Sequence, residues 1–76
     1  MRVSKGEKME RKQKITEKDK ELIKLVAEGC LDAEIGNRMD IAYGTVRYRL
    51  DKLYAKTATV NRPHLVYWAF KNGLLN

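Results

Sequence analysis

The segment 42–57 constrains the fold most, because apolar side chains recur at helical spacing in its sequence, AYGTVRYRLDKLYAKT. Val46, Leu50 and Leu53 stand at i, i+4 and i+7 and therefore share one face of an α-helix. At about 100° per residue, the opposite face and its flanks carry Gly44, Thr45, Arg47, Tyr48, Arg49, Asp51, Lys52 and Ala55. We predict an amphipathic helix that buries an apolar stripe and exposes cations, a hydroxyl and an aromatic ring.

This helix has two interpretations. It could enter the major groove of DNA, which admits an α-helix and offers hydrogen-bond partners to such side chains. It could equally be an ordinary solvated helix, because charged outer faces are common on amphipathic helices. The segment alone does not separate the two, so the rest of the chain has to decide.

The composition limits what can stabilise a chain of 76 residues. A domain this small usually needs a disulfide, a metal or a partner chain. One cysteine cannot form an internal disulfide, and Cys30 with His64 cannot complete a four-ligand zinc site. We therefore expect no metal and no cofactor, and self-association remains as the means of adding stability.

The net charge of +6 favours an anionic partner, either nucleic acid or a membrane surface. No apolar run approaches about 18 residues, and the N-terminus lacks the apolar region of a signal peptide. We therefore expect a cytoplasmic protein with no membrane partner, and no small-molecule ligand is evident.

Residues 1–14 hold six Lys or Arg against two acids, with few apolar residues. We predict a flexible basic tail over 1–14 and one helical domain over 15–76. The tail either contacts DNA phosphates nonspecifically or is only a solvated leader.

Two helices are predicted before the segment 42–57. Thr16 is an N-cap with Asp19 three residues on, and Gly29 stands where the first helix ends. Asp32 is predicted to cap a second helix over 32–39, in which Gly36 suggests close approach of another helix. Two helices joined by a short turn match a helix-turn-helix, which favours the DNA-reading interpretation of the third.

A fourth helix is predicted after Asn61, which caps it, with Pro63 in its first turn. The helix is apolar on more than one side: Leu65, Ala69, Val66 and Phe70 can cover the core. Tyr67 and Trp68 are then hard to bury, and exposed aromatic patches usually mark interfaces. We predict homodimerisation through this helix, with an interface of Leu65, Tyr67 and Trp68. The alternative is that Trp68 only completes the edge of the core.

The chain resembles the LuxR/GerE-type helix-turn-helix domain over residues 15–75. The matching stretches, in the family's order and spacing, are ITEKDKELIKLVAEG, AEI, residues 41–50 with GTVRYRL, Leu53-Tyr54, Asn61-Arg62 and Gly73-Leu74-Leu75. The resemblance implies an all-α, four-helix domain with its recognition helix, 43–56, in the major groove and its fourth helix in a dimer. Because no receiver or ligand-binding domain precedes the helices, we expect a stand-alone, GerE-like regulator.

The resemblance also implies which side chains meet DNA. Its base-facing positions are those of Arg47, Tyr48 and Asp51. Thr45 matches a position that usually contacts a backbone phosphate, and Arg49 and Lys52 are close enough on the helical wheel to do the same.

Several positions depart from the family's pattern. Ala42 stands where a Ser or Thr usually caps the recognition helix, and Ala33 stands where a Lys is common. Asp51 is an acid where Ser or Lys is frequent; it could accept a hydrogen bond from cytosine N4, or pair with Arg47 at i, i+4. The stretch 57–59 replaces the family's usual Leu-Gly-Val, which puts the path between the third and fourth helices in doubt.

The leading hypothesis is a homodimeric, sequence-specific transcription regulator that binds double-stranded DNA. The alternative is a protein-binding adapter or anti-regulator that keeps the fold without DNA recognition. We do not expect an enzyme, because the sequence shows no nucleophile–base pair, metal cluster or phosphate-binding glycine loop.

Overall fold

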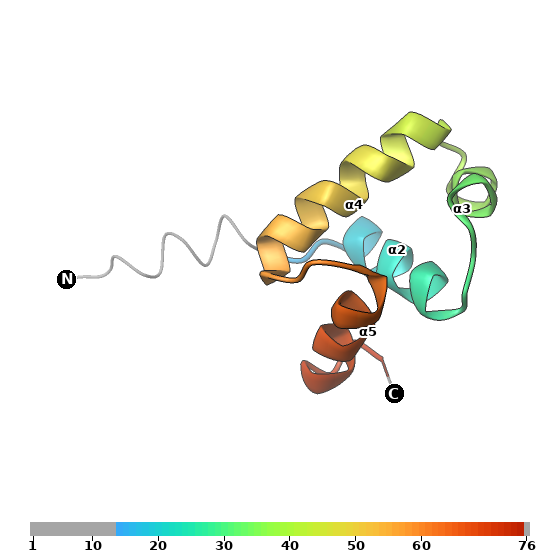
Figure 1. Cartoon of the computed structure of the whole chain (residues 1–76). Helices are drawn as coiled ribbons and strands as arrows, with labels where there is room; N and C mark the ends of the chain where they lie inside the picture. Colours follow the sequence, from blue (N-terminus) through green and yellow to red (C-terminus); the bar gives the residue numbers. More distant parts are fainter. Residues whose placement is uncertain (1–13, 76) are drawn as a thin grey trace.

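The computed structural model describes residues 14–75. Four helices follow one another: α2 (Glu17–Ala27), α3 (Asp32–Met39), α4 (Tyr43–Thr57) and α5 (Arg62–Lys71) (Figure 1). No strand occurs within residues 14–75, so the prediction of an all-α, four-helix domain is confirmed. Almost all of the predicted basic tail, residues 1–13, lies outside the described residues.

The helices form two closely packed pairs, α2 with α5 and α3 with α4. In the view of Figure 1, α2 lies in the middle, with α4 above it, α5 below it and α3 at one end. This arrangement leaves one long side of α4 uncovered by the other described helices. No helix within residues 14–75 is long and apolar enough to cross a membrane.

The core forms where the apolar faces of the four helices meet. Its fully buried side chains include Leu22, Ile23, Ile35, Val46, Leu53 and Leu65. The predicted stripe of α4, Val46, Leu50 and Leu53, is buried as expected. Phe70 differs from the prediction, because 61% of its surface is exposed rather than covering the core.

The start of α2 is the predicted capping box. The Thr16 hydroxyl accepts a hydrogen bond from the Asp19 backbone N–H at 3.1 Å, and the Asp19 carboxylate accepts one from the Thr16 backbone N–H at 3.0 Å. Gly29 follows the helix with φ +85°, a conformation that glycine adopts without steric cost. Local sequence rules therefore account for both ends of α2.

The start of α3 departs from the prediction, in which Asp32 was the N-cap. Leu31 is the N-cap and makes no side-chain hydrogen bond, whereas Asp32 is the first helical residue and is buried. The Asp32 carboxylate pairs with Arg47 and Arg62 instead. Contacts with two distant helices thus outweigh the local capping role.

The turn between α3 and α4 depends on Gly36. A Cβ atom at this position would lie 2.8 Å from the Ile41 carbonyl oxygen and 3.5 Å from Val46 Cγ2. The predicted close approach is present, but its nearest partner is the backbone of the turn rather than another helix. The absence of a side chain at Gly36 allows the turn and the start of α4 to pack directly against α3.

The connection between α4 and α5 is held by buried hydroxyls. Thr57 donates to the Leu53 carbonyl oxygen at 2.9 Å, and its own oxygen lies 2.9 Å from the Thr59 hydroxyl. Because the single Thr57 proton is used by Leu53, the Thr59 hydroxyl is the donor of the second bond. Hydrogen bonds of Thr57 and Thr59 therefore fix the connection that leads into α5. Asn61 provides the predicted N-cap of that helix.

Candidate nucleic-acid interface

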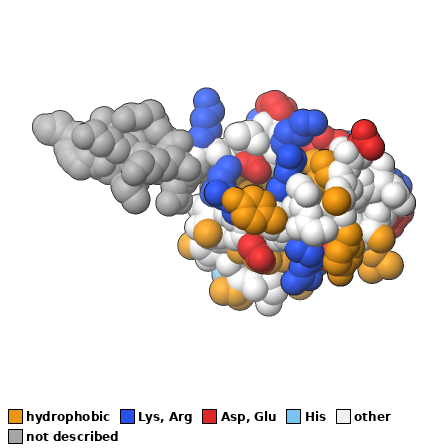
Figure 2. Space-filling model, turned by 90° about the horizontal axis from the view of Figure 1, so that it is seen from above, with side chains coloured by type: hydrophobic (Ala, Val, Ile, Leu, Met, Phe, Trp, Pro, Cys, Tyr) orange, Lys and Arg blue, Asp and Glu red, His pale blue; other side chains and the backbone are white. Residues whose placement is uncertain are grey.

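The outer face of α4 carries the side chains that the sequence assigned to DNA. Arg47, Tyr48, Asp51 and Lys52 are exposed, and Thr45 and Arg49 are half-buried at the flanks. The structure therefore places four of the six on the uncovered side of α4 and the other two, Thr45 and Arg49, at its flanks. Figure 2, which looks onto the upper side of Figure 1, shows Lys and Arg side chains spread among apolar and acidic ones.

Tyr48 and Lys52 lie against each other on this face. The Lys52 ammonium stands 5.6 Å from the centre of the Tyr48 ring, within the range of a cation–π contact. The contact holds a flat apolar surface and a positive charge side by side at the middle of α4. Such a pair can meet a base edge and a phosphate group at the same time.

Arg47 does not form the pair with Asp51 that its spacing allowed. Its guanidinium Nη1 lies 3.4 Å from Asp32 Oδ2, across the boundary between α4 and α3, and 59% of its side chain is exposed. Both Arg47 and Asp51 act on Tyr54, which lies about two turns beyond Arg47 and about one turn beyond Asp51 along α4. Burial raises the pKa of the Tyr54 phenol, Arg47 opposes the rise, and Asp51 adds to it. Tyr54 therefore remains a neutral phenol near neutral pH.

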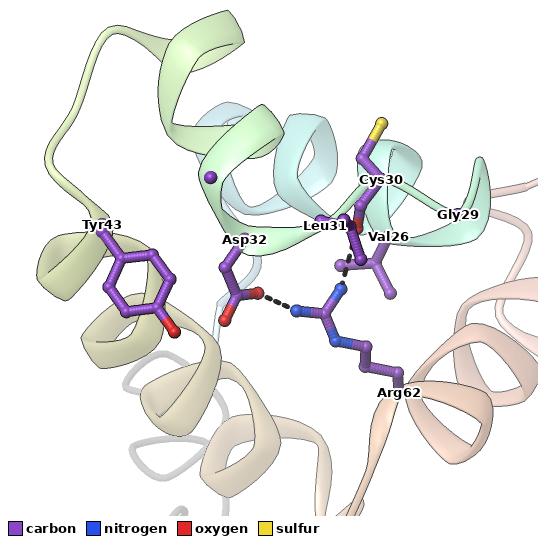
Figure 3. Close-up of a pocket in the computed structure, with 8 residues that line it drawn as sticks. Val26, Gly29, Cys30, Leu31, Asp32, Tyr43 and Arg62 are labelled. Atoms are coloured by element: carbon purple, nitrogen blue, oxygen red, sulfur yellow. Dashed lines mark hydrogen bonds and ion pairs between the residues drawn. The ribbon is translucent and has the colours of Figure 1, made fainter.

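Asp32 is the site residue that the sequence reasoning missed. Its carboxylate accepts from the Arg62 guanidinium, which also donates to the Cys30 carbonyl oxygen at 3.0 Å (Figure 3). These groups line a pocket of about 560 Å³ beside Tyr43 and Leu31. Because an aspartate at the start of a helix is typical of an N-cap, the local pattern predicted a capping role for Asp32 rather than a pair with Arg62. The only signal was Arg62, within the Asn61-Arg62 pair that matches the family.

A second group of cations lies beside the lower flank of α4. A pocket of about 360 Å³ is lined by Thr16, Lys18, Asp19, Tyr48, Arg49, Lys52 and Lys56. Lys18 reaches this group from the start of α2, and the sequence reasoning did not assign it. Lys18 and Lys56 therefore extend the positive charge of the assigned Arg49 and Lys52 towards α2.

One acid within this group is neutralised inside the protein. Lys56 lies 2.6 Å from Asp19 Oδ2 and also donates to the Lys14 carbonyl oxygen at 3.1 Å. Burial raises the pKa of Asp19, but the hydrogen bonds from Lys56 and from the Thr16 backbone outweigh burial and hold the pKa below its ordinary value. Asp19 is thus ionised near neutral pH, and its charge is balanced by Lys56.

The surface of α5 corrects one of the predicted dimer residues. Leu65 is fully buried in the core of its own chain, so it offers no surface to a second chain. Trp68 is half-buried and packs against the core, whereas Tyr67 is exposed. The aromatic surface of α5 consists of Tyr67 and Phe70. They border an apolar groove of about 590 Å³, whose remaining lining residues are Val26, Arg62, Pro63, Val66 and Leu75.

Comparison with known proteins gives the family. The model described as "Bacterial regulatory proteins, luxR family" matches residues 13–69. The monoamine regulon transcriptional regulator of Klebsiella aerogenes is 38% identical over 52 residues, which cover 68% of this chain and 23% of that protein. The probable transcriptional regulator ycf29 of Porphyra purpurea is 36% identical over 62 residues, 82% of this chain and 30% of that protein.

The ycf29 protein of Cyanophora paradoxa is 33% identical over 60 residues, 79% of this chain and 29% of that protein. The chain thus spans less than a third of the length of these relatives. No solved structure shows significant similarity. The family model covers most of the described helices, and the order and packing of those helices agree with the predicted helix-turn-helix. The chain therefore belongs to the luxR family of bacterial regulatory proteins.

Proposed function

We propose that this chain is a sequence-specific DNA-binding transcription regulator that inserts α4 into the major groove and acts as a homodimer. Membership of the luxR family and relatives named as transcriptional regulators support the regulatory role. The net charge of +6 suits a polyanionic partner.

One observation carries the proposal: α4 buries a single apolar stripe and exposes Arg47, Tyr48 and Asp51 on its uncovered side. An α-helix with its side chains is about 10–12 Å across, and the major groove is about 12 Å wide. The uncovered side of α4 can therefore lie along the base edges while α3 stays packed behind it.

The exposed side chains divide into two roles. Arg47 can donate two hydrogen bonds to guanine O6 and N7, and Asp51 can accept one from cytosine N4. Tyr48 offers its ring to a thymine methyl group. Thr45, Arg49 and Lys52 would contact phosphates, which fix the position of the helix without reading sequence.

The dimer would form through α5. Tyr67 and Phe70 are exposed aromatic side chains beside an apolar groove, which is the composition of an interface centre. Two copies related by a twofold axis would place their α4 helices about 34 Å apart, one turn of the double helix. The target would then be an inverted repeat.

Selection of bound fragments from random DNA tests the proposal. The expected result is an inverted repeat with half-sites centred about 10 base pairs apart. Enrichment of no sequence at all, with equal retention of every fragment, would contradict sequence-specific binding. A single unrepeated half-site would contradict the dimer and leave DNA reading intact.

A protein-binding adapter is the second candidate function, favoured by the start of α3. Leu31 is 74% exposed there, and Ala33 supplies no charge beside it. The two functions differ in their response to salt. DNA binding weakens steeply as the salt concentration rises, whereas an apolar protein contact does not.

A further inference from the structure

Asp32 joins three helices through one carboxylate. It lies at the first position of α3 and is 9% exposed. Its Oδ1 accepts from Arg62 of α5, and its Oδ2 lies 3.4 Å from Nη1 of Arg47 on α4 (Figure 3 shows the Asp32–Arg62 pair). One buried acid thus connects the helix with the exposed aromatic surface to the helix with the DNA-facing surface.

The two arginines are held to different degrees. Arg62 is 34% exposed and has a second acceptor, the Cys30 carbonyl oxygen, so its guanidinium is fixed from two sides. Arg47 is 59% exposed and has a longer contact with Asp32. A guanidinium has five N–H donors, and the contact with Asp32 occupies only part of them. The Arg47 guanidinium is therefore held by Asp32 on one side, and its remaining N–H groups face solvent.

The charges at this site do not balance among the described residues 14–75. Two guanidinium groups share one carboxylate, so one positive charge remains, and it is carried by the more exposed Arg47. Arg62 supplies the counter-charge that a nine-tenths buried acid requires. The remaining charge is available to an anion or an acceptor outside the protein.

We propose that Asp32 is a positioning residue, which restrains the Arg47 guanidinium so that it reads a base rather than contacting phosphates at random. The inference rests on the proposed function and adds a specificity determinant outside the recognition helix. A guanidinium already held in one orientation loses less conformational entropy when it binds a base edge. The nearby carboxylate also repels phosphates, which lowers affinity for DNA of any sequence.

The contrasting explanation is that Asp32 only fastens α3 to α5 through Arg62. In that case its loss would lower the stability of the fold without changing the preference for one DNA sequence over another. Asp32→Asn separates the two explanations. The amide keeps one carbonyl oxygen to accept from Arg62, removes the negative charge, and replaces the other acceptor with an NH₂ group.

Glu34→Gln is the matched control. It removes one negative charge from the same helix, but Glu34 is exposed and pairs with Arg38, not with Arg47. The measured quantity is the ratio of affinities for the selected DNA site and for a scrambled site. We expect Asp32→Asn to lower this ratio about tenfold, while Glu34→Gln leaves it unchanged. In an Arg47→Ala background, Asp32→Asn should have no further effect on the ratio.

A second measurement needs no DNA. NMR of the arginine side chains reports the rate of rotation about the Nε–Cζ bond, which pairing with a carboxylate slows. We expect slower rotation for Arg47 than for Arg49, which makes no ion pair within residues 14–75, and faster rotation of Arg47 in Asp32→Asn.

The outcomes separate this inference from the proposed function. Equal rotation rates for Arg47 and Arg49 in the wild-type chain overturn the restraint, even if Asp32→Asn does not fold. An unchanged affinity ratio in a folded Asp32→Asn that still binds DNA overturns the role in specificity and leaves the proposed function standing. A wild-type chain that binds no DNA overturns the proposed function and with it the base-reading role, while the NMR comparison still decides whether Asp32 restrains Arg47.

Discussion

The Arg47 guanidinium uses part of its N–H donors within the chain and leaves the rest to solvent. Inside the chain it contacts Asp32, and outside it faces the solvent where a base edge would lie. Arg49, two residues on, is half-buried and faces the flank of α4. We therefore expect Arg47 to contribute to the choice of DNA sequence and Arg49 to contribute to the affinity for DNA of any sequence.

Arg47→Ala and Arg49→Ala test this division. Arg47→Ala should cost about 1–3 kcal/mol on the selected DNA site and relax the preference at one base pair. Arg49→Ala should weaken binding to all sequences alike and reduce the dependence of log K on log salt by about one. Titrations at several salt concentrations, on the selected and scrambled sites, measure both effects. Equal losses on both DNA sites for Arg47→Ala would remove it from the base-reading residues.

Asp19 makes the stability of the fold depend on pH. Its folded pKa lies below its ordinary value of 3.8, so the ionised carboxylate stabilises the fold above that value. This contribution is lost as the pH falls through the lower folded pKa. We expect Asp19→Asn to be less stable than wild type near neutral pH and the difference to narrow below about pH 4. Urea unfolding at several pH values measures the gap; a gap independent of pH would contradict the role of the charge.

At the scale of elements, glycines in two helices have opposite roles. A Cβ at Gly36 would lie 2.8 Å from a backbone oxygen of the turn, which cannot move away as a flexible side chain can. A Cβ at Gly44, in the first turn of α4, would meet nothing within 4 Å. A glycine-to-alanine substitution therefore tests close packing at position 36 and helix propensity at position 44.

Gly36→Ala should destabilise the fold by about 1–3 kcal/mol, because an overpacked site forces the backbone to shift. Gly44→Ala should stabilise it by about 0.5–1 kcal/mol, since alanine favours the helix over glycine. The free energy of unfolding, measured in urea without DNA, tests both. A neutral Gly36→Ala would mean that the turn relaxes without cost and does not fix α4 on α3.

The helices were predictable from the sequence because their signals are local. The capping box at Thr16, the glycine after α2 and the stripe of Val46, Leu50 and Leu53 depend only on neighbours within a few turns. The role of Asp32 was not predictable in this way. Its partners Arg47 and Arg62 lie 15 and 30 residues away, and only the packing of three helices brings them together.

The surface of α5 shows the same limit. A helix that is apolar on more than one side does not reveal which side faces its own core. Leu65 was therefore predicted both to cover the core and to lie in the dimer interface, and Phe70 was predicted to cover the core. Leu65 is fully buried in the core, and Phe70 is mostly exposed. The outward residues of α4 were easier to predict, because its opposite side has one apolar stripe and the rest is polar.

At the scale of the whole molecule, the exposed aromatics of α5 and the uncovered side of α4 belong to different surfaces. Tyr67 and Phe70 border a groove between α2, α5 and the C-terminal residues, whereas Arg47 and Tyr48 lie on α4. A second copy can therefore cover the groove while both α4 helices remain available to one DNA duplex. Dimerisation would then add the affinities of two half-sites in one binding event.

A negative charge in the groove tests this arrangement. We expect Tyr67→Asp and Phe70→Asp to shift the chain from dimer to monomer in sedimentation, because an apolar interface centre does not accommodate an unpaired carboxylate. Val60→Asp is the matched control, since Val60 is exposed in the loop before α5 and does not line the groove. The two groove variants should also bind a full inverted repeat about as weakly as a single half-site. A wild-type chain that sediments as a monomer, or a Tyr67→Asp chain that stays dimeric, would contradict dimerisation through this groove and move the search for a partner to the exposed Leu31 at the start of α3.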